Sequence, residues 1–358
     1  MMRARVRRER GFVLVLVLAM LVVLGLLAGT IATVTGRLAE QAQQRAQLTR
    51  DAVGIASTRA TVLYLLSTQR MTVGGLTVDN LVSFGEGGIR QIESRTDLDS
   101  SLPTGTELAL DNRSYRGIGD VRFSLQDDYG LLGVNWNPHW RLERFLAQGG
   151  HPRPLPAEAL INRLFDYQDR DDLYRLNSME ADGYRKIGMA PPTNLPLATP
   201  MQVIQVAGWK QALSFLTPAE ISDNITVEAV AVVNVNTAPA RVLRILDGVD
   251  EEKAARAIAF RKLQPFMTEV AFFEFLGLPK SPEAPVAVYP ATSGTLKLWP
   301  SHGGQVGLVH WMMTPIDEKG GRPWREDYEL IQSQAPSQDD VALPVRSRLF
   351  GQQVAPRK

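Results

Sequence analysis

The chain has 358 residues, no cysteine and a formal net charge of +1. Its length allows a membrane anchor together with two or more soluble units. The lack of cysteine excludes disulfides, cysteine nucleophiles and thiolate zinc sites. The first 11 residues carry a side-chain charge of +4, which leaves about −3 on the remainder. A net negative charge does not favour binding to nucleic acid. The four histidines (His139, His151, His302 and His310) lack the spacing of a histidine metal motif.

The first 36 residues combine a short basic segment with a long apolar one. Five arginines precede Gly11, and the 25 residues from Phe12 to Gly36 carry no charge. About 20 apolar residues in a helix span the ~30 Å hydrocarbon layer of a membrane. The segment therefore predicts a single membrane-spanning helix, with the arginines cytoplasmic and the rest of the chain exported.

Three interpretations of this N-terminal segment are open. A secretory signal peptide has a shorter apolar core and a better cleavage site than Thr30-Ile31-Ala32. A simple signal anchor fits the composition. The third interpretation rests on the Arg10-Gly11-Phe12 junction, which stands before the apolar run. This arrangement is similar to the type IV pilin class, in which a prepilin peptidase cuts after the Gly, and it predicts cleavage between Gly11 and Phe12.

The helical pattern continues beyond the apolar run. From Arg37 to Arg70 there is no proline, and apolar residues recur at a spacing of three and four (Val53, Ala56, Ala60, Leu63 and Leu66). We expect one helix over residues 12–70, with the membrane span at 12–36. The alternative is two helices broken near Gly36 or Gly54.

The pattern changes to strand, to helix and back to strand along the rest of the chain. In residues 71–137, Val121, Phe123 and Leu125 alternate with polar residues, which predicts a strand with one solvated face. Residues 281–333 return to strand patterns, with Asp317–Gly321 as a hairpin turn. We expect a flexible tail at 334–358.

Residues 138–280 read as a large helical region in two units, about 138–224 and 225–280. Short helices are predicted at Arg141–Gln148, Ala157–Tyr167, Pro200–Val206, Pro218–Ile221, Ala238–Leu246, Glu251–Arg261 and Glu269–Phe275. Thr199, Thr217 and Thr237 place a hydroxyl where an N-cap is expected.

Six carboxylates lie within 17 residues of this region: Asp166, Asp169, Asp171, Asp172, Glu180 and Asp182. Oxygen ligands at short spacing suit Ca²⁺, which takes six to eight of them. Counted from Asp169, the fifth and sixth loop positions are Leu173 and Tyr174, so the loop is not an EF-hand. A non-EF calcium loop, a solvated acidic loop and the carboxylate pair of a hydrolase remain open.

A second motif resembles a helix-hairpin-helix unit. It runs from Val233-Asn234-Val235-Asn236-Thr237 through Gly248-Val249-Asp250 to the helix predicted from Glu251. Such hairpins bind DNA phosphate when the turn reads Gly-apolar-Gly. Asp250 replaces the second Gly and adds negative charge beside Glu251 and Glu252, which disfavours phosphate. The sequence also lacks the nucleophile-elbow, P-loop, HExxH and dinucleotide-binding motifs, so nothing in it argues for an enzyme.

Together these pieces resemble the general secretion pathway protein K family, the large minor pseudopilin of type II secretion. The matching segments occur in one order: Arg10–Phe12, Leu125–Leu132, Leu164–Asp172, Glu180–Tyr184, Pro192–Leu197 and Val233–Ala238. The resemblance implies an α+β fold, with a long N-terminal helix, a pilin-like antiparallel sheet built from residues 71–137 and 281–333, and a large all-α insertion of SAM-like or helix-hairpin-helix-like units.

The family resemblance also implies a function and its sites. It implies an inner-membrane, single-pass pseudopilin with its bulk in the periplasm, trimmed after Gly11 and N-methylated on Phe12, which is not an enzyme. It implies Ca²⁺ in the helical insertion. The preferred ligands are Asp169, Asp171, Glu180 and Asp182, and Asp172 and Asp166 are the next candidates.

The implied role is at the tip of the periplasmic pseudopilus, initiating or capping its assembly. Most pilin-like proteins carry Glu as the fifth residue after the cleaved Gly, and here that residue is Leu16. A subunit without this Glu offers no partner to the N-terminal amine of a subunit above it. The implied partners are other minor pseudopilins in a hetero-complex, the major pseudopilin, the inner-membrane assembly platform, prepilin peptidase and exported substrate, without nucleic acid.

Two other functions remain open from the residues alone. One is a membrane-anchored periplasmic hydrolase that uses the acidic loop with Ca²⁺. The other is a DNA-binding or DNA-uptake protein that uses the hairpin.

Overall fold

The computed structural model describes residues 10–78, 102, 103, 105, 107–150, 155–279, 285–314, 321–333 and 350. The predicted leader up to residue 9 and the predicted tail, apart from Phe350, lie outside the described residues, as do residues 317–320 of the predicted hairpin turn. The chain forms two compact units, Met1–Val53 and Gly54–Lys358.

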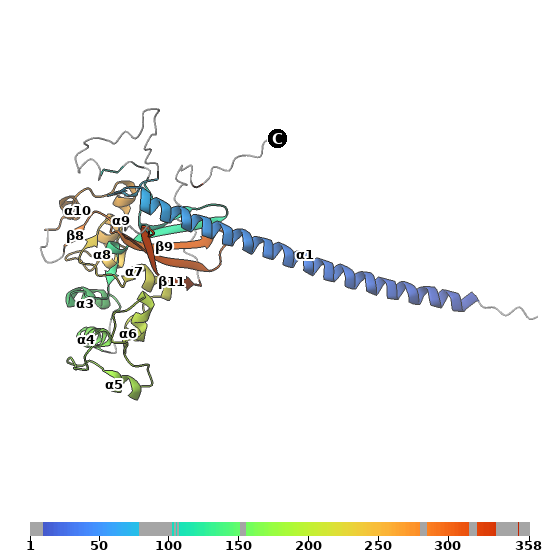
Figure 1. Ribbon diagram of the computed structural model, residues 1–358, viewed down its shortest axis with the longest axis horizontal. Helices are drawn as coiled ribbons and strands as arrows, with labels where there is room; N and C mark the ends of the chain where they lie inside the picture. Colours follow the sequence, from blue (N-terminus) through green and yellow to red (C-terminus); the bar gives the residue numbers. More distant parts are fainter. Residues whose placement is uncertain are drawn as a thin grey trace, which may run out of the picture. The chain divides into compact units, whose positions relative to one another are not determined.

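Helix α1 runs without a break from Arg10 to Thr68, which confirms the prediction of one long helix (Figure 1). Its N-terminal part is long and apolar enough to cross a membrane, with a mean hydropathy of 3.1 over its most apolar 18 residues, none of them buried. Gly54 does not break the helix. A Cβ at this position would lie 2.8 Å from Val121 Cγ2, so Gly54 instead allows a close approach between α1 and a strand.

The second unit contains a five-stranded antiparallel sheet in the order β11-β10-β9-β4-β3. The strands are β3 (Asp111–Arg116), β4 (Val121–Asp127), β9 (Ser293–Pro300), β10 (Val306–Met313) and β11 (Trp324–Gln332). Strands β10 and β11 pair as the predicted hairpin. Before the sheet, β1 (Met71–Thr72) and β2 (Gly75–Leu76) form a small ribbon.

One face of the sheet packs against the C-terminal part of α1. Val62, Leu65 and Leu66 of α1 share a core with side chains from four strands of the sheet. The sheet residues of this core are Tyr115, Val121, Phe123, Leu125, Leu296, Leu298 and Trp311. The alternation of apolar residues in β4 therefore places its large side chains under the helix.

The opposite face is polar but not solvated, so the prediction of a solvated face on β4 is wrong. Ser124 and Gln126 of β4 are buried, as are Lys297 and His310 on the neighbouring strands. Gln126 Nε2 donates to the carbonyl of Thr237, and Lys297 forms an ion pair with Asp223. The helical region covers this face, and its polar groups satisfy those of the sheet.

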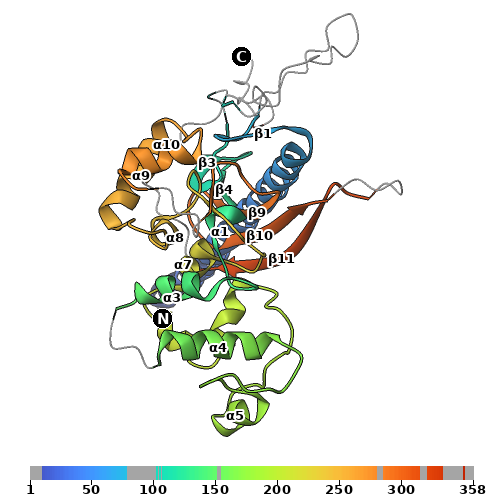
Figure 2. The same ribbon diagram turned by 90° about the vertical axis from the view of Figure 1, so that its left-hand side faces the viewer.

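Along the chain, the helical region lies between β5 (Leu132–Gly133) and β8 (Val286–Ala287). Figure 2 shows most of its helices beside the sheet. Its helices are α3 (His139–Ala147), α4 (Ala157–Gln168), α5 (Ala181–Lys186), η2 (Pro200–Gln205), α6 (Trp209–Ala212), α7 (Pro218–Asn224), α8 (Ala240–Leu243), α9 (Glu251–Leu263) and α10 (Glu269–Leu276). One hydrophobic core joins them, from Leu160 and Trp209 to Phe266 and Phe272.

Two pairs of very short strands also belong to the helical region. Strand β6 (Ile225–Thr226) pairs in parallel with β5, and β7 (Val233–Asn234) pairs in parallel with β8. The two strands of each pair lie far apart in the chain. They therefore fasten the helical region at its edges to the segments that enter and leave it.

The three threonines predicted as N-caps behave differently. Thr217 forms a full capping box with Glu220 at the start of α7. Thr199 precedes η2 without a capping hydrogen bond. For Thr237 the prediction is wrong, because Pro239 is the N-cap residue of α8 and the Thr237 hydroxyl donates instead to Asp127 Oδ2 at 2.9 Å.

Candidate functional site

The predicted acidic cluster lies at the end of α4, in the loop that follows and at the start of α5. Asp166 on α4 is fully buried, and Asp169 is the C-cap residue of that helix. The guanidinium of Arg175 forms ion pairs with both carboxylates, and Arg175 N donates to Asp166 Oδ2 at 3.1 Å. The structure thus brings two of the predicted ligands together around one cationic side chain.

Glu180 adds a third carboxyl group to this cluster. It is the N-cap residue of α5, is 3% exposed, and its side chain makes no capping hydrogen bond. Burial, together with the charges of Asp166, Asp169 and Asp172, raises the pKa of Glu180 to about 7. Glu180 Oε1, Asp169 Oδ1 and Ser178 Oγ are all buried without a hydrogen-bond partner. Such atoms normally find partners in a protein interior.

The other predicted ligands are less closely gathered. Asp171 Oδ1 accepts a hydrogen bond of 2.9 Å from Leu173 N within the loop. Asp172 is close enough to Glu180 for its charge to raise the pKa of that group. The Asp182 side chain is 74% exposed and pairs with Arg185 at 3.0 Å.

These residues fit a calcium ion in their chemistry. The unpartnered oxygens of Asp169, Glu180 and Ser178 are the hard donors that Ca²⁺ prefers. The Arg175 guanidinium pairs with both Asp166 and Asp169 and offsets one of their two negative charges, so a bound cation would compete with it for these carboxylates. Asp166, Asp169 and Glu180 are the residues that would hold the ion, with Asp171 and Asp172 within the same loop.

Two of the segments that carry the family resemblance, Leu125–Leu132 and Val233–Ala238, meet at a buried junction. Asp127, at the end of β4, accepts hydrogen bonds from Asn234 Nδ2 (2.8 Å), Thr237 Oγ1 (2.9 Å) and the backbone N–H groups of Tyr129 and Ala291. Its side chain is fully buried. Burial outweighs these hydrogen bonds and raises the pKa of Asp127 to about 7. The junction is structural, since its four donors fill the carboxylate and leave it no access to solvent.

The hairpin motif is tied down by its own side chains. Asn236 Nδ2 donates to the carbonyls of Phe266 and Val288, and Asn236 Oδ1 accepts from Phe266 N at 2.8 Å. Asp250 is the N-cap residue of α9, and its side chain accepts from Lys253 N at 2.8 Å. The position that a phosphate would take in a DNA-binding hairpin therefore holds a carboxylate bound to the helix terminus.

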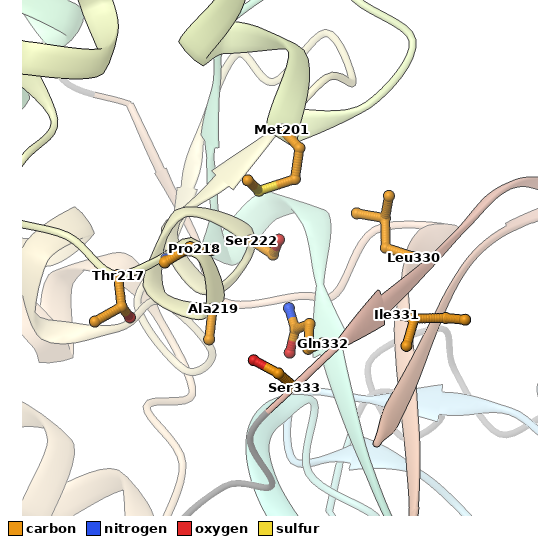
Figure 3. A pocket seen from close by; sticks show the side chains of 9 residues that line it. All are labelled: Met201, Thr217, Pro218, Ala219, Ser222, Leu330, Ile331, Gln332 and Ser333. Atoms are coloured by element: carbon orange, nitrogen blue, oxygen red, sulfur yellow. The ribbon is translucent and has the colours of Figure 1, made fainter.

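An open groove of about 340 Å³ lies between the start of α7 and the end of β11, the edge strand of the sheet (Figure 3). Its lining residues are Met201, Thr217, Pro218, Ala219, Ser222, Leu330, Ile331, Gln332 and Ser333. None of these nine residues has a side chain that titrates near neutral pH. The lining therefore supplies no general acid or base.

The predicted processing residues, Gly11 and Phe12, lie in the first turn of α1. The helix already includes Gly11, and Phe12 is 76% exposed. Leu16, at the position where most pilin-like proteins have Glu, is 49% exposed on the apolar surface of the helix.

A further group of potential ligands was missed by the sequence analysis. Glu228, His310 and Asp327 place one ligand atom each within 4.8 Å of one another, the one such group of three or more among the described residues. These three residues are widely separated in the chain and form no motif. The pairing of β10 with β11 and the fold of the helical region bring them together.

One of the comparisons with known proteins gives a family match. Residues 233–289 match the family model of type II secretion system protein K, the same family that the sequence resembles, and of the segments that carry the resemblance this stretch includes Val233–Ala238. The comparison with curated proteins gives no match. Among solved structures, the chain is similar to one in the crystal structure of the GspK–GspI–GspJ complex of the type 2 secretion system from enterotoxigenic Escherichia coli. The identity is 13%, the TM-score is 0.49, and the match covers 82% of this chain and 100% of that one.

Proposed function

We propose that this chain is a minor pseudopilin of the type II secretion system, anchored in the inner membrane by α1 with its bulk in the periplasm. In this proposal a prepilin peptidase removes the leader after Gly11, and Phe12 becomes the N-methylated first residue. The mature protein then initiates or caps the pseudopilus from its tip and supports export of folded proteins across the outer membrane. Its role is assembly rather than catalysis.

The observation that carries the proposal is the distribution of exposed and buried apolar residues along α1. Its N-terminal part is apolar and exposed, whereas Val62, Leu65 and Leu66 near its C-terminal end are buried against an antiparallel sheet. An exposed apolar helix of this kind is costly in water and is stable in lipid or against similar helices. A helix that leaves the membrane and packs beside similar helices in a filament requires this apolar composition.

The tip position is supported by two features. Leu16 offers no carboxylate to the N-terminal amine of a neighbouring subunit, and a buried carboxylate in a membrane is costly unless it is paired. The helical region adds residues 139–276 to the sheet unit. A bulky addition of this kind would hinder another subunit from stacking above it.

The proposed partners are other minor pseudopilins at the tip, the major pseudopilin, the inner-membrane assembly platform and prepilin peptidase, with exported substrate as a further contact. Ca²⁺ is the proposed cofactor of the acidic loop. Its role would be to order the loop, because bound Ca²⁺ stabilises only the folded loop and so shifts the equilibrium toward it.

Leader removal tests the proposal directly. In cells with an active prepilin peptidase, the wild-type protein is expected to begin at Phe12, and Gly11→Ala is expected to retain the leader. Gly25→Ala is the matched control, because a Cβ at Gly25 of the same helix meets no atom within 4 Å. N-terminal sequencing of the membrane-extracted protein distinguishes the two forms. If Gly11→Ala were trimmed like the wild type, the pseudopilin assignment would fail.

Partner choice tests the tip position. Because the chain has no cysteine, single cysteines can be introduced without background for cross-linking in cells. We expect cross-links to other minor pseudopilins and a copy number far below that of the major pseudopilin in sheared pseudopili. Incorporation along the whole filament, at a copy number comparable with that of the major subunit, would contradict a tip position.

A further inference from the structure

We propose that Glu228, His310 and Asp327 form a binding site for a divalent transition metal ion of the Zn²⁺ class, on the buried polar face of the sheet. This site is separate from the acidic loop. It also does not depend on the proposed function, because its test does not involve secretion.

The three side chains already approach the geometry that a metal requires. His310 Nδ1 lies 2.9 Å from Asp327 Oδ2, and a carboxylate oxygen of Glu228 completes a set whose ligand atoms all lie within 4.8 Å of one another. Metal–ligand bonds of about 2.1 Å in a tetrahedron place ligand atoms about 3.4 Å apart. Movements of about 1 Å by side chains would therefore be enough to close the site around an ion.

The second nitrogen of His310 is held as it is in many metal sites. His310 Nε2 lies 2.9 Å from Asp128 Oδ2, and Asp128 itself accepts hydrogen bonds from Thr226 Oγ1 and Ser293 Oγ. A ligating histidine commonly donates its other N–H to a carboxylate, which fixes the tautomer and makes the ligating nitrogen more basic. Asp128 is therefore the positioning residue that leaves Nδ1 directed at Asp327.

A bulge in β11 turns Asp327 toward the site. In the pairing of β10 with β11, His310 lies opposite Tyr328 and Trp311 lies opposite Glu326, which leaves Asp327 as the additional residue. Successive residues of a regular strand point to opposite faces, so Asp327 and Tyr328 would not both reach His310 without the irregularity. Here the Asp327 carboxylate contacts Nδ1, and the Tyr328 ring stacks on the imidazole with 4.9 Å between centroids. Bulges often re-aim a side chain at functional sites.

The charges and an unpartnered donor favour a cation at this place. The site holds three carboxyl groups, those of Asp128, Glu228 and Asp327, and Arg325 pairs with Asp327 at 2.7 Å. A divalent ion would bring two further positive charges to these carboxyl groups. The Tyr328 hydroxyl is buried without a hydrogen-bond partner, and the charges of Asp128, Glu228 and Asp327 act on it.

The site has an entry path, and its ligands come from separate parts of the fold. His310 is fully buried, but the Asp327 side chain is 24% exposed and Glu228 is half-buried, so an ion can enter from solvent. Glu228 belongs to the segment between β6 and β7, whereas His310 and Asp327 belong to β10 and β11. A bound ion would therefore clamp the helical region to the sheet, as structural zinc sites clamp separate segments.

The test uses the full chain in detergent, stripped of metals and supplied with Ca²⁺ to fill the acidic loop. Zn²⁺ is titrated against a chromophoric chelator, and Co²⁺ is added separately to read the ligand geometry from its visible absorption. Glu228→Gln is the main variant, because its half-buried side chain is tolerant of substitution, and Asp327→Asn is the second. Glu251→Gln on the exposed start of α9 is the matched control, and Glu180→Gln reports on the acidic loop.

We expect one equivalent of Zn²⁺ to bind, with the affinity lowered about tenfold or more by Glu228→Gln and by Asp327→Asn and unchanged by the two other variants. The Co²⁺ spectrum is expected to show four-coordinate binding that is lost in Glu228→Gln. No Zn²⁺ binding by the wild type would overturn the proposal. Binding that survives both substitutions, or that is lost in Glu180→Gln, would overturn it as well.

Discussion

Asn234 donates a 2.8 Å hydrogen bond to Asp127, and the two residues lie at the ends of β7 and β4. The contact joins the helical region to the sheet through two fully buried side chains. Asn234 Oδ1 also accepts a hydrogen bond from Asn236 N at 3.0 Å, so both the nitrogen and the oxygen of the side-chain amide are hydrogen-bonded. Two segments that carry the family resemblance in the sequence, Leu125–Leu132 and Val233–Ala238, thus form the two halves of one buried junction.

We expect Asn234→Asp to weaken this junction strongly. The substitution replaces a donor to Asp127 by a second carboxyl group in a site without solvent access. Losing one partner of a buried hydrogen bond costs about 1–3 kcal/mol, and more where charge is involved. The free energy of unfolding from urea denaturation of the full chain measures the loss. Asn194→Asp, the same change at a half-exposed position, should leave the stability within about 0.5 kcal/mol of the wild type.

The attachment of α1 to the sheet depends on its apolar contacts. Leu65 is fully buried in the shared core, so Leu65→Ala should cost about 2–5 kcal/mol of the free energy of unfolding. Leu263 at the end of α9 is 90% exposed, and Leu263→Ala should cost less than about 0.5 kcal/mol. Equal losses in the two variants would show that α1 is not held by this core.

Calcium is expected to raise the melting temperature of the full chain, and a chelator to reverse the increase. Asp169→Asn should abolish most of the shift, because it removes charge from a carboxylate with an unpartnered buried oxygen. Asp247→Asn, at a half-exposed aspartate paired with Arg144, is the control and should keep the full shift. A melting temperature that is the same with and without Ca²⁺ would remove the calcium proposal.

The pH dependence of this loop follows from Glu180. Its pKa is raised from the ordinary value of 4.5 to about 7, so the folded chain holds a proton that the unfolded chain releases. Without Ca²⁺, the contribution of Glu180 to the free energy of unfolding should be highest below pH 4.5 and should fall as the pH rises toward 7. Melting temperatures across this range measure the slope, which Glu180→Gln should remove.

Calcium should reverse this trend, because it binds the ionised carboxylate. The Ca²⁺-induced increase in melting temperature is therefore expected to grow as the pH rises through 7. A shift that is constant over this range in the wild type would show that Glu180 is not a ligand.

The sequence predicted the elements whose residues lie close together in the chain. The uncharged run after Gly11 and the helical spacing beyond it gave α1 over almost its full length, and alternation gave β4, β9 and the β10–β11 hairpin. These patterns depend on local periodicity, which the chain carries in every segment.

The features that the sequence did not predict depend on contacts between segments that lie far apart in the chain. Ser124 and Gln126 read as solvated, but they are buried because the helical region covers that face of the sheet. The sequence predicted Thr237 as a helix cap, but its hydroxyl donates a hydrogen bond to the buried Asp127. Among the predicted calcium ligands, nothing in the spacing indicated that Arg175 would lie between Asp166 and Asp169.

Strands β7 and β8 pair in parallel, with Val233 opposite Val286 and Asn234 opposite Ala287. These two strands lie at the start and near the end of residues 233–289, the stretch that matches the family model. The polypeptide therefore enters and leaves this stretch at neighbouring points. The number of residues between the two strands can change without altering the register of the five-stranded sheet, but any change in helices α8, α9 and α10 must preserve the core that they share with the rest of the helical region.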